Sequence, residues 1–241
     1  MIYFVSDIHL GLFDRKQDIK REDLFLEFLT KIKDDCDKLY LVGDIFDYWF
    51  DYKTVIPKFF YRTLSALYDL RKICEIEFVI GNHDFGHNGF FVNELDIPIY
   101  GSDIERLHHG KKFYISHGDG KDPKDKGYLL LKKIMRAQAS LALYLKLHPN
   151  IGIKLASSSS KTSRDYTSKK DFGDENAMLD FAKHKIDTGF DYVIMGHRHK
   201  AEITTYKSGL YVNLGEWIRE PHYGVFDGNK FDLIKFGMNK L

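Results

Sequence analysis

Short apolar runs alternate with amphipathic stretches along the first half of the chain. Residues 21–35 and 57–73 place apolar side chains at helical spacing, which predicts two helices packed on a core. The apolar runs, rich in β-branched and aromatic residues, predict buried strands at 1–6, 38–43, 76–81, 111–118 and 191–197. An order of strand, helix, strand, helix and strand predicts a sheet whose early part is parallel, with helices against it.

The pattern changes near the C-terminus. From Ala201 onward, residues 201–218 and 222–236 form short alternating runs that are interrupted by the hairpin signals SG and DGN. We therefore expect an antiparallel second sheet packed on the first. The fold class that we predict is α/β, with two packed mixed β-sheets flanked by helices.

Residues 121–172 interrupt this regular layout. Residues 128–147 are strongly helical in pattern, the sequence HPN breaks the helix, and a polar, basic stretch rich in serine follows. We predict a helical, basic cap of two helices and a flexible arm, inserted into a single domain that spans residues 1–241. A plain disordered loop is the alternative interpretation of the serine run.

Composition is that of a soluble globular protein, with 241 residues and 44% hydrophobic residues. No apolar stretch reaches the roughly 20 residues that span a bilayer, and no secretory signal precedes Asp7, so we expect a cytoplasmic protein. The separated Cys36 and Cys74 suggest neither a disulfide framework nor a thiolate zinc site.

Charge is distributed unevenly along the chain. Residues 121–170 contain twelve Lys or Arg and three Asp, a local balance of +9, whereas the remainder carries 24 basic and 32 acidic residues, a balance of −8. The basic segment favours an anionic partner such as a phosphorylated ligand, a nucleic acid or an anionic membrane surface. An ordinary solvated helix face is the alternative.

Polar residues of the kind that bind metals follow five of the predicted strands. They are Asp7 and His9, Asp44, Asn82 and His83, His117, and His197 and His199. Loops at the carboxyl ends of strands in such a sheet converge on one crevice. Carboxylate, amide and imidazole ligands without thiolate suit Mn²⁺, Mg²⁺, Fe²⁺ or Zn²⁺. There are too many ligands for one ion, so we expect two divalent ions, bridged by one carboxylate, that activate water for attack on phosphorus.

These motifs, DxH, GDxxD, GNHD, HG and GHxH in that order, resemble the signature of the calcineurin-like metallophosphoesterases. The resemblance implies a four-layer sandwich with Mn²⁺ as the expected metal. It implies that Asp44 bridges the ions, that His83 contacts the scissile phosphate and assists the leaving group, and that Asp84 orients His83. One ion would be held by Asp7, His9 and His199, and the other by Asn82, His117 and His197, of which Asn82 and His197 would also contact substrate.

The insert is similar to that of family members that cleave the pyrophosphate bond of a diacylated UDP-sugar in lipid A assembly, releasing UMP and the sugar 1-phosphate. This similarity implies a nucleotide-sugar lipid as substrate and peripheral association with the cytoplasmic face of the inner membrane. It also implies substrate contacts from Asp125, Ser163, Thr167 and Lys170. The apolar face of residues 129–145 would line acyl-chain grooves, or else would be the core of the cap itself.

Two alternatives remain open at this point. Those family members often carry Arg where this chain has His83, so another nucleotide or phosphodiester is the alternative substrate. A nucleic acid is not expected, because the basic arm has few aromatic residues for base stacking. A non-catalytic scaffold of the same fold is the remote alternative, although scaffolds usually lose metal ligands and none is missing here.

Overall fold

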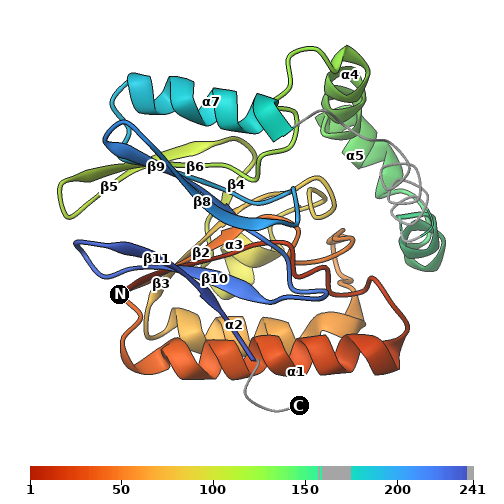
Figure 1. The fold of residues 1–241 in the computed structure, drawn as a ribbon. Coiled ribbons are helices and arrows are strands. Elements are labelled where there is room, and N and C mark those ends of the chain that lie inside the picture. Colours follow the sequence, from red (N-terminus) through yellow and green to blue (C-terminus); the bar gives the residue numbers. More distant parts are fainter. Residues whose placement is uncertain (157, 159–174, 238–241) are drawn as a thin grey trace.

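Two β-sheets packed face to face form the centre of the molecule (Figure 1). The computed structural model describes residues 1–156, 158 and 175–237. The first sheet has the order β11-β10-β1-β2-β3-β4, with strands Phe231–Lys235, His222–Phe226, Ile2–Val5, Lys38–Val42, Glu75–Val79 and Ile99–Tyr100. The second has the order β5-β6-β7-β9-β8, with strands Ile104–His108, Lys111–Ile115, Tyr192–Met195, Gly209–Leu214 and Ala201–Tyr206.

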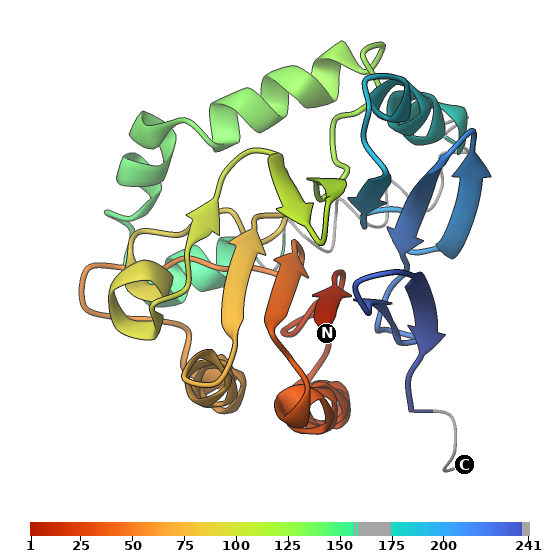
Figure 2. The same cartoon turned by 90° about the vertical axis from the view of Figure 1, so that its left-hand side faces the viewer.

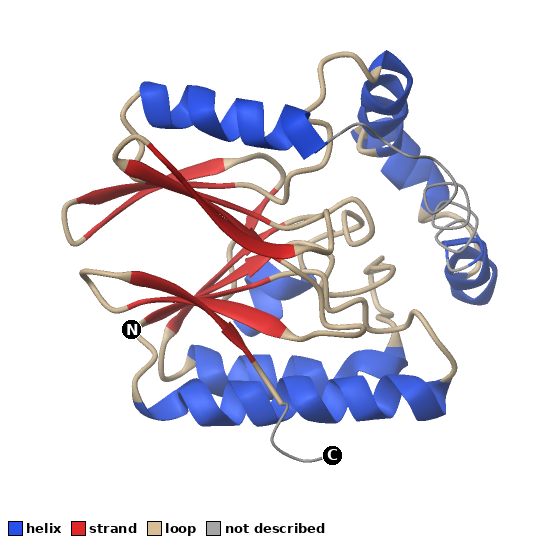
Figure 3. Ribbon diagram, in the orientation of Figure 1, coloured by secondary structure: helices blue, strands red, loops and turns tan. Residues whose placement is uncertain are grey.

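Helices cover the outer faces of both sheets (Figures 1 and 3). The helices α1, α2 and α3 pack on the first sheet and α7 packs on the second, with bounds Arg15–Lys31, Tyr61–Arg71, Phe90–Leu95 and Glu175–Asp187. Short 3₁₀ helices occupy Ile32–Asp34 and Lys58–Phe60. The layers are thus helix, sheet, sheet and helix, which confirms the predicted α/β class.

The central strands are apolar on both faces because each face is covered. In β1, Ile2 and Phe4 point into the core between the two sheets, whereas Tyr3 and Val5 point toward α1. The parallel pairing of β1 with β2 and of β2 with β3 repeats this arrangement. Continuous apolar runs in the sequence therefore predicted buried strands correctly.

The two C-terminal hairpins separate between the sheets, which corrects the expectation of one antiparallel second sheet. β8 and β9 form an antiparallel hairpin in the second sheet, whereas β10 pairs antiparallel with β1 in the first. The second sheet is mixed, because β6, β7 and β9 run parallel. The edge of β1 opposite β2 is open to pairing, and the last hairpin occupies it.

The insertion forms a row of helices along one end of the sandwich (Figures 1 and 2). α4 spans Lys126–Met135 and α5 spans Gln138–Tyr144, and the extended backbone of Ala137 separates them. Residues 149–156 are helical again. The predicted arm lies outside the described residues. Among the described helices, none is both long and apolar enough to cross a membrane.

Candidate active site

The ends of β1, β2, β3, β6 and β7 meet at the end of the sandwich that faces α4 and α5 (Figure 1). Backbone pairing continues past the strands and fixes the loops against one another. The Asp7 N–H donates to Gly43 O at 3.1 Å, and the His9 N–H donates to Asp44 O at 3.0 Å. All the strand-end residues singled out by the sequence, from Asp7 to His199, therefore converge on one site.

One group of potential ligands consists of Asp7, His9 and His199. Asp7 Oδ1 lies 3.3 Å from His199 Nε2 and 3.7 Å from His9 Nε2, and the two imidazole nitrogens are 3.2 Å apart. Asp7 Oδ1 is buried without a hydrogen-bond partner among the described residues. An orphaned carboxylate oxygen facing two imidazole nitrogens fits a divalent cation.

A second group consists of Asp44, His117 and His197. Asp44 Oδ2 lies 3.4 Å from His117 Nε2 and 3.8 Å from His9 Nε2, so this carboxylate faces both groups. Asn82 Oδ1 lies 3.1 Å from His117 Nε2. His117 Nδ1 donates to Val42 O at 2.9 Å, which leaves Nε2 facing the site.

The backbone at this site is strained. Left-handed φ angles between 53° and 70° occur at five of the predicted ligands, namely Asp7, His9, Asp44, His197 and His199. Such conformations are costly for residues other than glycine and persist only where surrounding contacts impose them. Gly81 and Gly196 allow the backbone to approach the two carboxylates closely. A Cβ on Gly81 would lie 2.0 Å from Asp44 Oδ1, and a Cβ on Gly196 would lie 2.3 Å from Asp7 Oδ2.

The buried acids and imidazoles perturb one another. Burial alone would lower the pKa values of His9 and His117, but the neighbouring carboxylates outweigh it and raise both to about 10. Burial likewise opposes ionisation of Asp7 and Asp44, yet the imidazoles hold the pKa of each carboxyl well below its usual range. The site therefore balances its negative charge with protons that a divalent ion would displace on binding.

His83 is held by Asp47 and not by Asp84, which corrects the role predicted for Asp84. His83 Nδ1 lies 3.2 Å from Asp47 O and 3.6 Å from Asp47 Oδ1, and Asp47 Oδ1 is also 3.2 Å from His9 Nδ1. The Asp84 carboxylate instead accepts from the backbone N–H groups of Gly81 and Ile45, each at 2.8 Å. Asp84 thus fixes the loops of the site.

The predicted substrate contacts outside the strand ends have different outcomes. Asp125 is the N-cap of α4, where its Oδ1 accepts from the Tyr128 N–H at 3.0 Å, and it does not line the cavity described below. A capping carboxylate turns toward its own helix, which accounts for the difference. Ser163, Thr167 and Lys170 lie outside the described residues.

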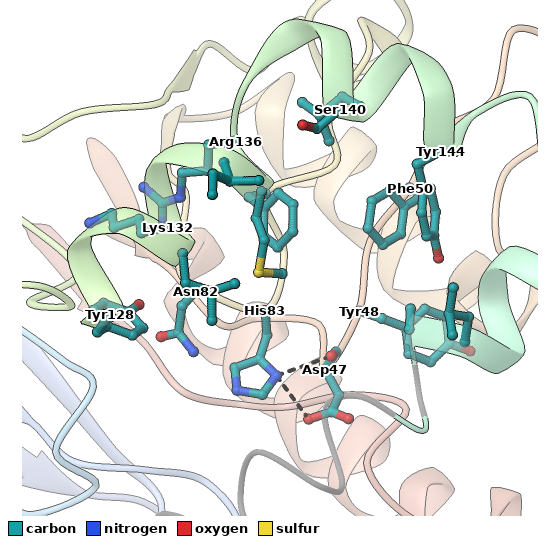
Figure 4. A pocket seen from close by; sticks show the side chains of 17 residues that line it. Asp47, Tyr48, Phe50, Asn82, His83, Tyr128, Lys132, Arg136, Ser140 and Tyr144 are labelled. Carbon is teal, nitrogen blue, oxygen red and sulfur yellow. Dashed lines mark hydrogen bonds and ion pairs between the residues drawn. The ribbon is translucent and has the colours of Figure 1, made fainter. Parts of the chain in front are cut away.

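A cavity of about 510 Å³ opens beside His83 and Asn82 (Figure 4). Its walls are largely apolar and come from both the sandwich and the insertion. Side chains from the sandwich include Tyr48, Phe50 and Phe85, and those from the insertion include Leu131, Ile134, Met135, Leu141 and Tyr144. The apolar face of the insertion therefore borders the site and is not only the core of a cap.

Sequence reasoning missed three polar residues next to the site. Asp119, two residues after His117, is buried and accepts hydrogen bonds from Lys132 and Arg136 of α4. Lys132 and Arg136 also line the cavity with Asn82 and His83. The available signal was the spacing of four residues between two cations on a predicted helix, which places both on one face.

Comparison with known proteins places this fold and site in a family. Residues 1–201 match the calcineurin-like phosphoesterase family. The UDP-2,3-diacylglucosamine hydrolase of Porphyromonas gingivalis is 31% identical over 96% of both chains. Enzymes of the same name from Ectopseudomonas mendocina and Photorhabdus laumondii are 27% identical (98% of each chain) and 26% identical (97% of this chain, 98% of theirs). The chain belongs to the calcineurin-like phosphoesterases and is a metal-dependent hydrolase.

Proposed function

We propose that this protein hydrolyses the pyrophosphate bond of UDP-2,3-diacylglucosamine, yielding UMP and 2,3-diacylglucosamine 1-phosphate in lipid A biosynthesis. The observation that carries the proposal is the apolar cavity that opens beside Asn82 and His83. A substrate with acyl chains and a diphosphate needs an apolar cavity directly next to the phosphate-cleaving groups. The relatives named for this substrate match the chain over nearly its whole length.

The proposal includes two divalent ions, with Mn²⁺ as the metal. Asp7, His9 and His199 would hold one ion, Asn82, His117 and His197 the other, and Asp44 would bridge them. When bound, such ions supply Lewis acidity and activate the attacking water. The orphaned Asp7 Oδ1 and the imidazole nitrogens that face the carboxylates support this arrangement.

The remaining groups position the substrate. His83, anchored by Asp47, would contact the scissile phosphate and donate a proton to the departing oxygen. Asn82 and His197, which both lie beside the His117 ring, would also contact the phosphate. The apolar cavity walls would exclude water from the acyl chains.

We also propose that the protein acts at the cytoplasmic face of the membrane. Leu130, Leu143 and Ile151 expose 60%, 69% and 60% of their surfaces on the insertion. Lys126 and Lys154 are exposed on the helices that carry Leu130 and Ile151. Apolar side chains interspersed with lysines favour an anionic lipid surface, where each lysine contributes about 1 kcal/mol.

The test compares three substrates in the presence of Mn²⁺. UDP-2,3-diacylglucosamine should exceed UDP-N-acetylglucosamine and a 2′,3′-cyclic nucleotide in kcat/KM by at least about 100-fold, because only the first fills the cavity. Mass spectrometry should find UMP and the acylated sugar 1-phosphate, and EDTA should stop the reaction. A preference for either compound without long acyl chains would show that the substrate assignment is wrong. Cosedimentation with anionic vesicles, absent with neutral ones, tests the membrane proposal separately.

A further inference from the structure

One face of α4 directs three polar side chains at a single buried carboxylate. Tyr128, Lys132 and Arg136 are spaced four residues apart, so they stack along one face of the helix. The Tyr128 hydroxyl donates to Asp119 Oδ2 at 3.0 Å, Lys132 Nζ lies 2.7 Å from the same oxygen, and Arg136 Nη2 lies 3.1 Å from it. One side chain thus holds both cations in place.

The two cations are not fully neutralised. Among the described residues, Asp119 is the only acid that either Lys132 or Arg136 contacts, which leaves one net positive charge. Within the described part of the chain, Arg136 donates two hydrogen bonds, both from Nη2. The acceptors are Gly81 O at 2.7 Å and Asp119 Oδ2. The Nε and Nη1 donors of Arg136 are therefore available, and its side chain is only 18% exposed.

Lys132 and Arg136 lie on the boundary between two cavities. They line the apolar cavity of about 510 Å³ together with Asn82 and His83 (Figure 4). They also line a second cavity of about 230 Å³, with polar walls that include His117, Asp119 and Asp103. A molecule with an apolar half and a polar half would place the apolar half in the first cavity and the polar half in the second. The group that links the halves would then lie beside Lys132 and Arg136, near Asn82 and His117.

We propose that Lys132 and Arg136 form a binding site for the second phosphate of a diphosphate substrate, with Asp119 as the residue that positions them. The reacting phosphate would lie at the strand-end groups, and the other would accept hydrogen bonds from the available donors of Arg136 and from Lys132. Arg offers a planar fork of donors that matches phosphate oxygens. The inference rests on the proposed function for the identity of the substrate but applies to any diphosphate diester.

The site makes the enzyme selective for diphosphates over simple phosphodiesters. A substrate with one phosphate does not reach Lys132 or Arg136, so these residues contribute nothing to its turnover. Losing one charge-assisted hydrogen bond should weaken binding of a diphosphate by about 10- to 100-fold. Selectivity, and not overall activity, is the property that separates this role from a structural one.

The experiment uses Lys132→Met and Arg136→Met, which keep an unbranched, flexible apolar side chain on α4 and remove its charge. Lys133→Met is the matched control, because Lys133 is an exposed neighbour on the same helix and lines neither cavity. Each variant is assayed at saturating Mn²⁺ on UDP-2,3-diacylglucosamine and on bis(p-nitrophenyl) phosphate. Inhibition of the second reaction by methylenediphosphonate and by inorganic phosphate is also measured.

Lys132→Met and Arg136→Met should each raise KM for the diphosphate substrate and Ki for methylenediphosphonate by about 10-fold or more. In both variants, turnover of bis(p-nitrophenyl) phosphate and its inhibition by inorganic phosphate should stay within about twofold of wild type. Arg136→Lys should recover part of the loss, and Lys133→Met should behave as wild type. Equal losses on both substrates, or unchanged inhibition by methylenediphosphonate, would overturn the inference. If wild type ignores the acylated substrate while the inhibition results hold, the proposed function fails and the diphosphate site stands.

Discussion

Single side chains at the strand ends carry the chemistry proposed for this protein. Asp44 has the most central position, because its Oδ2 lies within 3.9 Å of the Nε2 atoms of His9, His83 and His117. Its φ of 54° is imposed by contacts from the loops around it. Such a residue affects both halves of the site at once.

Asp44→Ala should lower the affinity for both ions by more than about 100-fold, since loss of even an outer-shell partner has effects up to that size. Turnover of bis(p-nitrophenyl) phosphate should fall accordingly. Elemental analysis after dialysis and steady-state kinetics measure the two effects. Asp37→Ala, at an exposed acid paired with the N-terminus, is the control. Retention of both ions by Asp44→Ala would contradict the bridging role.

His87 is a buried imidazole that the proposed chemistry does not use. It lies among the rings of Trp49, Phe78 and Phe91, with centroid distances of 5.8, 5.1 and 5.0 Å. Burial lowers its pKa to about 3. The ordinary value is 6.5, so the unfolded chain takes up a proton as the pH falls below 6.5 while the folded protein does not.

Protonation of His87 in the unfolded chain should therefore lower the free energy of unfolding of the wild-type protein by roughly 2 kcal/mol when the pH falls from 7 to 5. His87→Leu should lack that loss, whereas His184→Gln on the exposed side of α7 should retain it. Urea unfolding of the EDTA-treated proteins at both pH values makes the comparison. A variant whose stability falls as steeply as that of wild type would show that His87 is protonated in the folded state.

At the scale of elements, α4 links the insertion to the site. Its N-terminus is capped by Asp125, and its Lys132 and Arg136 contact Asp119 one and two turns further along the same face as Tyr128. Fraying of the first turn would loosen these contacts. Asp125 caps the helix in the structure, whereas the sequence suggested that it contacts substrate. Replacing Asp125 by serine should distinguish these two roles.

Asp125→Ala should weaken the cap by about 0.5–2 kcal/mol and increase hydrogen exchange in residues 126–135. Because fraying loosens Lys132 and Arg136, the same variant should raise KM for UDP-2,3-diacylglucosamine. Serine is also a good N-cap, so Asp125→Ser should restore both protection and KM. If Asp125→Ser instead keeps the raised KM while protection is normal, the carboxylate contacts substrate directly and the cap is secondary.

At the scale of the whole molecule, the cavity exists only because the insertion lies against the sandwich. Tyr144 of α5 packs on Phe50 with ring centroids 4.1 Å apart, which joins the two parts of the wall. Ser140 also lines the cavity, whereas the adjacent Ala139 is exposed and does not. These neighbours provide a matched pair for filling the cavity.

Ser140→Trp should fill part of the cavity and reduce kcat/KM for UDP-2,3-diacylglucosamine by about tenfold or more, because overpacking costs 1–3 kcal/mol. Turnover of bis(p-nitrophenyl) phosphate should be unchanged, and Ala139→Trp should leave both activities intact. Steady-state kinetics on the two substrates test this. Equal activity of Ser140→Trp on the acylated substrate would show that acyl chains bind elsewhere.

The sequence by itself determined the buried strands and the candidate metal ligands that follow them. Strands such as β1 are apolar on both faces, and local pattern reports burial directly. Asp7 and Asp44 follow neighbouring parallel strands of one sheet, so their convergence could be predicted from the sequence. His197 follows β7 of the second sheet and reaches them because the two sheets pack face to face.

Only the tertiary structure decided the contacts between segments distant in sequence. The last hairpin joined the first sheet because the edge of β1 was open. The alternating apolar pattern of the hairpin does not specify which sheet it joins. Asp84 accepts hydrogen bonds from backbone amides, whereas Asp47 contacts His83. Asp119 contacts both Lys132 and Arg136. Each buried carboxylate can bond only to the donors that the packing of the elements brings within reach. Sequence spacing specifies which face of an element a side chain occupies, whereas its partner depends on how the elements pack.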